Sequence, residues 1–159
     1  MQVMTAQFTE ILSHAGKRHS LCTLPLETYL DMTSKRALLA DLHGHTACTR
    51  RYVGVWEIAD GRLLLTRLHT LKEEDFPLDV LFPGIRSPIF ANWFTGTLRC
   101  PKGELLKYVH FDFLSIYERD WLIDVKDGLV QGERLVVNPP PPPRDPQEES
   151  DIPEFLKKR

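Results

Sequence analysis

Hydrophobic and polar residues alternate along residues 49–69, and a period of two is typical of a β-strand with one buried face. On this pattern, one face of the first strand carries Tyr52, Gly54, Trp56 and Ile58. The dipeptide Asp60-Gly61 divides the segment, and Asp-Gly is a strong signal for a two-residue hairpin turn. We therefore predict a β-hairpin here, in which Gly54 marks a bulge or the close approach of another strand.

Other segments repeat this pattern. Residues 11–22 read as two short extended pieces around a turn at Ala15-Gly16-Lys17. Residues 89–113 are divided by Pro101-Lys102-Gly103, and residues 116–137 are divided by Asp127-Gly128. Successive hairpins favour an antiparallel meander of about six to eight strands, curled into a roll or half-barrel that limits its exposed edges.

The helical signals lie near the N-terminus. Pro25 suits the first turn of a helix, because its missing N–H needs no partner there. A second helix is predicted from Ser34 to His43, with Leu38 and Leu39 in its apolar stripe and Gly44 as its capping residue. The predicted fold class is thus α+β, mainly β, with a short N-terminal helical segment.

The length of 159 residues fits one core, and we predict a single globular domain over residues 1–138. The long connection over residues 71–88 is expected to cover part of the sheet, with Leu78, Val80, Leu81 and Phe82 turned inward. Five consecutive prolines, residues 139–143, cannot pair in a sheet and favour polyproline II. Residues 139–159 are therefore predicted to form a proline-rich, polar tail.

The charge balance argues against a nucleic-acid partner, since 20 basic residues face 22 acidic ones and the formal net charge is -2. The apolar runs fall well below the roughly 20 residues that a membrane-spanning helix needs. The first residues lack the basic and apolar regions of a signal peptide, and the three cysteines show no disulfide or CxxC spacing. We expect a cytoplasmic protein with no membrane association, and nothing in the sequence fixes an oligomeric state.

The motif DLHGHT, residues 41–46, has the character of a metal site. It resembles the opening motif of the polymerase-and-histidinol-phosphatase family of metal-dependent phosphoesterases, whose HxH pair binds metal at the end of a first barrel strand. That resemblance implies a long α/β barrel, whereas hairpins follow the motif here. A cupin-like β-barrel is the other metal interpretation, in which His43 and His45 share a strand face and His110 or Glu118 completes the site.

A junction between elements accounts for DLHGHT more simply. If residues 34–43 form a helix, Gly44 caps it, His43 lies in its last turn, and His45 belongs to the following connection. The two imidazoles then need not converge. We therefore favour no metal site and expect no cofactor, and His43, His45 and His110 remain the candidate ligands of the alternative.

Candidate catalytic groups occur in the second half of the chain. His110 and Asp112 share a strand face with Tyr108, and Glu118 follows after a short turn. A histidine beside a carboxylate can act as a general base, although the same group is also an ordinary hydrogen-bonded patch. No nucleophile or oxyanion-donor pattern accompanies it, so the sequence leans against an enzyme.

A protein partner fits the composition of the sheet half better, because aromatic and arginine side chains are enriched at binding hot spots. The candidate binding residues are Arg51, Trp93, Tyr108, His110, Tyr117, Glu118 and Arg119. Residues 50–138 also resemble a recurring pattern of small bacterial proteins to which no activity is attached, in residues such as Gly54, Trp56, Trp93 and Gly103. The resemblance implies a bacterial cytoplasmic protein.

The leading hypothesis is a non-enzymatic, cytoplasmic protein-binding module, and its concrete form is an immunity protein that neutralises a cognate toxin. The alternative is a metal-dependent or small-ligand-binding enzyme that uses His43, His45 and His110 in a β-roll. A third hypothesis is an adaptor whose polyproline tail docks into an aromatic groove of another protein.

Overall fold

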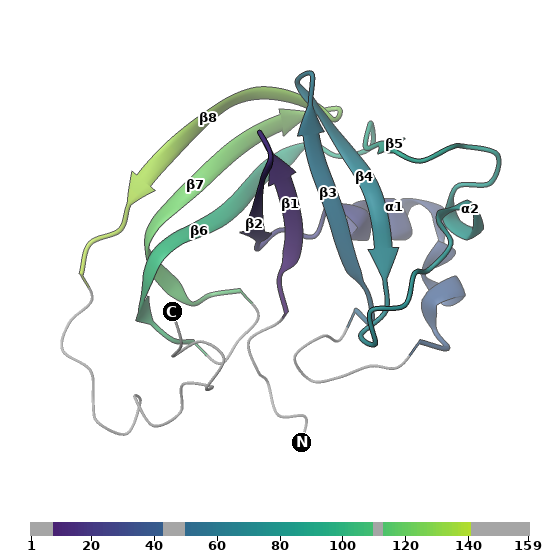
Figure 1. Cartoon of the computed structure of the whole chain (residues 1–159), viewed down its shortest axis with the longest axis horizontal. Coiled ribbons are helices and arrows are strands. Elements are labelled where there is room, and N and C mark those ends of the chain that lie inside the picture. The colour runs from purple at the N-terminus through teal and green to yellow at the C-terminus, as the bar shows by residue number, and fades with distance from the viewer. Residues whose placement is uncertain (1–7, 43–49, 110–112, 141–159) are drawn as a thin grey trace.

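The computed structural model describes residues 8–42, 50–109 and 113–140 (Figure 1). Its elements in chain order are β1 (Glu10–His14), β2 (Lys17–Leu21), α1 (Pro25–Thr33), the 3₁₀ helix η1 (Lys35–Leu39), β3 (Val53–Ala59), β4 (Arg62–His69), α2 (Leu78–Leu81), β5 (Ile89–Phe90), β6 (Gly96–Lys107), β7 (Ile116–Lys126) and β8 (Leu129–Val137). The protein is α+β and mainly β, as the alternating pattern predicts. None of the helices in these ranges is long and apolar enough to cross a membrane.

The eight strands form one mixed sheet in the order β2-β1-β3-β4-β8-β7-β6, and β5 pairs with β4. Antiparallel pairing prevails, but β1 and β3 are parallel, with Ile11 opposite Val55. The predicted meander is interrupted where β8, rather than β6, continues the sheet beside β4. The antiparallel direction predicted for it is wrong at the β1–β3 junction. The cause is the connection through α1 and η1, which returns the chain so that it enters β3 in the direction of β1.

The sheet bends where one group of strands, β2-β1-β3-β4, meets the other, β8-β7-β6; we call these two groups the ladders of the sheet. β4 and β8 share the register pair Arg62–Leu129, flanked by hydrogen bonds from Leu63 N to Gly128 O (2.9 Å) and from Val130 N to Gly61 O (2.8 Å). From this joint the two strands diverge, as Figure 1 shows at the top of the molecule. The sheet is curled but not closed, which matches the predicted half-barrel.

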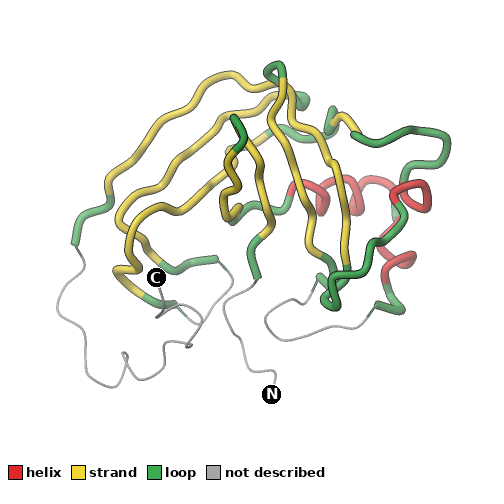
Figure 2. The backbone as a smooth tube through the Cα atoms, viewed as in Figure 1, coloured by secondary structure: helices red, strands yellow, loops and turns green. Residues whose placement is uncertain are grey.

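The hydrophobic core fills the concave side of the curl, which we call the inner face of the sheet. Fully buried side chains on this face include Leu12, Leu21, Trp56, Leu63, Leu65, Leu98 and Ile123. The helices lie together beside one end of the sheet (Figure 2), and Leu26 and Leu30 of α1 join the same core cluster. Tyr52, Gly54 and Trp56, which the alternation groups on one face, are all buried. The alternation itself did not indicate which of the two faces is the buried one.

The hairpin turns at Ala15-Gly16, Asp60-Gly61 and Asp127-Gly128 are present with the positive φ angles that such turns need. The turn predicted at residues 101–103 is wrong, because β6 continues through it and Lys102 pairs with Arg119. Gly103 has a φ of 80° and lies in an irregular stretch of the ladder, between Lys102 and Leu105. A glycine with positive φ serves a bulge as well as a turn, and an edge strand such as β6 tolerates the proline.

The helix predicted from Ser34 to His43 is also shorter and of another type. Ser34 lies in the left-handed region with a φ of 57° and separates α1 from the 3₁₀ helix η1, which ends at Leu39. The predicted cap Gly44 lies outside the described residues. In the long connection, Leu81 and Phe82 are buried as expected, whereas Val80 is exposed because α2 turns it to the surface.

Glu10 is a fully buried carboxylate between β1 and β3. Its Oε2 accepts hydrogen bonds from Arg50 Nη2 (2.9 Å) and from the backbone N–H of Gly54 (2.6 Å), and Trp56 Nε1 donates to Oε1 at 3.3 Å. A Cβ on Gly54 would lie 2.5 Å from Glu10 Oε1, so this position requires glycine. Both alternatives predicted for Gly54 have a counterpart: the ladder shifts register between Val55 and Trp56, and the Glu10 side chain of the neighbouring strand β1 approaches Gly54 closely.

Candidate functional site

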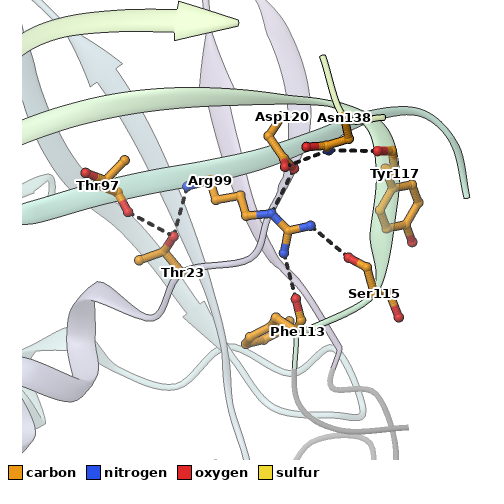
Figure 3. A network of polar contacts seen from close by, with 8 residues as sticks. All are labelled: Thr23, Thr97, Arg99, Phe113, Ser115, Tyr117, Asp120 and Asn138. Carbon is orange, nitrogen blue, oxygen red and sulfur yellow. Dashed lines mark hydrogen bonds and ion pairs between the residues drawn. The ribbon is translucent and has the colours of Figure 1, made fainter. Parts of the chain in front are cut away.

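Arg99 of β6 organises a polar network on the outer face of the sheet, shown in Figure 3. Its Nε donates to Asp120 Oδ1 at 2.8 Å and forms an ion pair with that carboxylate. Its Nη1 and Nη2 donate to the carbonyl oxygens of Phe113 (2.6 Å) and Ser115 (2.8 Å). One guanidinium therefore holds the chain just before β7 against the sheet.

Asn138 completes the network at the end of β8. Its Nδ2 donates to Asp120 Oδ2 at 3.0 Å and to the carbonyl oxygen of Tyr117 at 2.8 Å (Figure 3). Its backbone N–H donates to the carbonyl oxygen of Glu118 at 2.9 Å. Asp120 thus accepts from both Arg99 and Asn138, which joins the start of β7 to the end of β8.

The network forms one wall of an open cavity of about 470 Å³. The cavity is lined by Arg99, Lys107, Phe113, Leu114, Ser115, Ile116, Asp120, Asn138, Pro139 and Pro140. Leu114 is 58% exposed and Ile116 is 36% exposed, so apolar side chains face solvent at its rim. A small cavity with an apolar rim and hydrogen-bonded polar wall is suited to an apolar side chain of a partner.

The cavity lies at the end of β8, since Asn138, Pro139 and Pro140 belong to its lining. β8 pairs with β7 over Leu129–Val137, but its pairing with β4 stops at Leu129 and Val130. Within the parts of the chain that the structure describes, the outer edge of residues 131–137 has no backbone partner. The same stretch exposes Leu135, Val136 and Val137. Apolar residues on an unpaired edge are a template for strand addition.

Arg99 and Asp120 have structural roles in this site. The Arg99 guanidinium is engaged with one carboxylate and two carbonyls, and its side chain is 24% exposed. Arg99 and Asp120 bind each other, and Arg99 also binds the backbone, so these two charges fix the wall of the cavity. Lys107 is the other charged residue of the lining, and the rim at Leu114 and Ile116 is apolar. The cavity can therefore bind a partner group, and the network of Arg99, Asp120 and Asn138 fixes its shape.

Four of the residues predicted to bind lie at this end of the molecule. Tyr108 follows β6, and Tyr117, Glu118 and Arg119 begin β7. Tyr117 and Glu118 contribute their carbonyls to Asn138, and the Glu118 side chain packs against Gly103. Arg119 pairs with Lys102 and belongs to the inner face. The structure therefore brings these residues together, but the cavity is lined by their neighbours.

Trp93 and Arg51 lie elsewhere. The Trp93 ring lies 4.9 Å from that of Tyr29 and 5.4 Å from that of Phe82, and its Nε1 donates to Pro25 O at 2.9 Å. It therefore fastens α1 to the loop before β6. Arg51 donates to the carbonyls of Ala40 and Leu42 and lines a separate cavity of about 440 Å³ beside η1. Neither residue contributes to the site at β8.

The remaining candidates, His43, His45, His110 and Asp112, lie outside the described residues. Among residues 8–42, 50–109 and 113–140, no group of three or more His, Cys, Asp or Glu side chains is placed to hold a metal ion. The proposed metal and general-base roles, including that of Glu118, thus stay predictions. Comparison with family models, with curated proteins and with solved structures found no match.

The sequence did not predict that Arg99, Asp120 and Asn138 form one hydrogen-bonded network. Each stands at a polar position of a strand or at its end, where the ordinary interpretation is a solvated face. A signal was present in Asn138, which follows β8 directly and precedes the prolines. An asparagine at that point can satisfy backbone carbonyls where regular pairing ends.

Replacing Arg99 by alanine is expected to lower the free energy of unfolding by about 2–3 kcal/mol, because hydrogen bonds from a charged donor contribute about 1.5–3 kcal/mol each and are not additive. Urea denaturation would measure the loss. The matched control is Arg134→Ala, which removes an outer-face arginine paired with Asp124, both about half exposed. That change is expected to cost under about 1 kcal/mol. Equal losses in the two variants would contradict the role given to Arg99.

Proposed function

We propose that this chain is a protein-binding module that contacts its partner through the open edge of β8 and the adjoining cavity. The observation that carries the proposal is the exposed apolar row Leu135–Val137 on an edge whose backbone has no described partner. Soluble proteins usually protect such edges with charge, proline or a covering element. A retained apolar edge is therefore suited to an interaction.

The partner that fits this surface is a protein with an extended segment able to add a strand along β8. Its backbone would supply the missing hydrogen bonds, and its alternate side chains would contact Leu135 and Val137 on one face of the sheet and Val136 on the other. An apolar side chain beyond the end of that strand would enter the cavity rimmed by Leu114 and Ile116.

The concrete form of the proposal is a cytoplasmic immunity protein that neutralises a toxin encoded by an adjacent gene. It is supported by the small size of the chain and by the bacterial resemblance of residues 50–138. A toxin inhibitor needs a binding surface and no catalytic group of its own, and the cavity and edge have this character.

The test co-expresses this chain with the product of each adjacent reading frame and measures growth and complex formation. We expect one neighbour to be toxic alone and to form a complex that Leu135→Lys weakens at least about tenfold, since a lysine opposes strand addition and burial at the edge. Leu38→Lys is the matched control, because Leu38 is 48% exposed on η1 and Leu135 is 57% exposed on β8. Absence of any complex, or equal weakening by both changes, would overturn the proposal.

A further inference from the structure

A cluster of basic side chains lies on the inner face of the sheet, just beyond the hydrophobic core. Leu12, His14, Lys17 and His19 share one face of the β1–β2 hairpin, because Leu12 pairs with His19 and His14 pairs with Lys17. Leu12 is fully buried, so this face continues the core toward the hairpin tip. The first half of the cluster is therefore His14, Lys17 and His19.

The second half comes from β6 and β7. Lys102 follows the buried Cys100 by two residues, so both lie on the inner face. Lys102 pairs directly with Arg119, and Cys100 pairs with Trp121. Like charges directly opposite each other destabilise a sheet, so the Lys102–Arg119 pair is unfavourable for folding alone. We call His14, Lys17, His19, Lys102 and Arg119 the inner-face basic cluster.

Three side chains of the cluster, those of His14, His19 and Lys102, converge on Trp121. The ring of His19 lies 4.9 Å from the Trp121 ring, and that of His14 lies 5.3 Å from it. Lys102 Nζ lies 5.7 Å from the same ring centre and donates a hydrogen bond to His19 Nδ1. Groups from three strands and from the half-buried Trp121 therefore surround one small region.

The positive charge of this region is uncompensated. Across residues 8–42, 50–109 and 113–140, no member of the inner-face basic cluster forms an ion pair with a carboxylate. Burial, together with the charges of Lys102, His14 and Lys17, lowers the pKa of His19. Burial also lowers the pKa of Lys102. The register places two acidic residues on this face, Glu133 opposite Ile123 on β8 and the buried Glu10, which is paired with Arg50.

We propose that the inner-face basic cluster binds a phosphate-type oxyanion, either as a free ion or as the phosphate of a small molecule. Lys102 and Arg119 supply adjacent donors, and an arginine can bind two oxyanion oxygens at once. His19 supplies a further donor after it takes up a proton. This site lies inside the curl and uses other residues than the binding surface proposed at β8, which it adjoins where Arg119 pairs with Val137 and Trp121 pairs with Leu135.

The anion and the proton on His19 favour each other. Because the pKa of His19 is lowered in the unliganded protein, its ring is largely neutral near pH 7 and accepts the hydrogen bond from Lys102. A bound dianion stabilises the imidazolium and raises that pKa. Affinity for a dianion should therefore rise as the pH falls through the region below about 6.5.

The test measures binding of sulfate and of inorganic phosphate to the full chain by calorimetry. Sulfate keeps its charge over the relevant range, so its pH dependence reports the protein. We expect sulfate affinity to rise several-fold between about pH 8 and about pH 5.5, and the rise to be smaller in His19→Gln. Phenyl phosphate forms a second arm: tighter binding than phosphate assigns the site to a phosphomonoester, and equal binding assigns it to the free ion.

Two charge-removing variants decide the location. Lys102→Ala and Arg119→Ala are each expected to weaken sulfate and phosphate binding about tenfold or more. Lys126→Ala removes an exposed lysine from the far end of β7 and should leave binding unchanged. Circular dichroism confirms that each variant is folded. Failure of both anions to bind, or equal affinity in Lys102→Ala and Lys126→Ala, overturns the proposal.

Discussion

Replacing Glu10 by alanine is expected to lower the free energy of unfolding by about 3–5 kcal/mol, which is the usual cost of breaking a buried ion pair from one side. The Glu10 side chain is fully buried and its partner Arg50 is 4% exposed. Without the carboxylate, the guanidinium of Arg50 loses this counter-charge, and the N–H groups of Gly54 and Trp56 lose their acceptor. Chemical denaturation followed by tryptophan fluorescence would measure the change.

Two further variants serve as controls for the Glu10→Ala result. Asp31→Ala removes a carboxylate that is 71% exposed and also pairs with an arginine, so its loss should stay below about 1 kcal/mol. Glu10→Gln keeps an acceptor of the same shape and should cost less than the alanine change. If Asp31→Ala proved as harmful as Glu10→Ala, the buried pair would not have the stabilising role given to it.

The pH dependence of the Glu10→Ala effect has a definite sign. Burial raises the pKa of Glu10, and this outweighs the opposing effects of Arg50 and of the hydrogen bonds from Gly54 and Trp56. A carboxyl whose pKa is raised on folding stabilises most below its ordinary pKa, and the stabilisation declines as the pH rises through the raised value. The difference between wild type and Glu10→Ala should therefore be larger at about pH 5 than at about pH 8.

Local features of the fold could be predicted because short-range chemistry determines them. The Asp-Gly turns need positive φ, and Pro25 fits the first turn of α1. In both cases the residues themselves determine the local backbone geometry. The alternation around Trp56 grouped Tyr52, Gly54 and Trp56 on one face, but the pattern did not indicate that this face is the buried one. Gly103 led to the wrong prediction of a turn, because a bulge and a turn both favour a glycine with positive φ.

Long-range features could not be predicted from these patterns. The alternation of hydrophobic residues in β4 and β8 does not indicate that these two strands are neighbours. Their joint at Arg62 and Leu129 depends on how the two ladders meet in space. The hydrogen-bond partners of Arg99 come from β7 and from the segment before it, so the sequence of β6 alone does not reveal that Arg99 joins them. Charged residues within strands are usually solvated, and the sequence does not mark the exceptions.

Gly128→Ala is expected to cost about 3–5 kcal/mol of unfolding free energy, because a strained backbone and a steric clash add together at this turn. Gly128 has a φ of 79°, and a Cβ there would lie 2.6 Å from the Phe90 ring and 2.7 Å from the carbonyl oxygen of Ala91. Its N–H donates to Phe94 O and its carbonyl accepts from Leu63 N, each at 2.9 Å. A shift that relieves the clash would therefore strain the joint between the two ladders.

Gly61→Ala separates the two contributions, since Gly61 occupies the other turn of the same joint. Its φ of 73° imposes a similar backbone strain, but a Cβ would meet no atom within 4 Å. We expect this change to cost about 1–2 kcal/mol, the strain of a left-handed residue alone. Urea unfolding of both variants under the same conditions measures the difference. If the two losses were equal, the close approach of Phe90 and Ala91 to Gly128 would add nothing to the backbone strain, which would contradict the prediction.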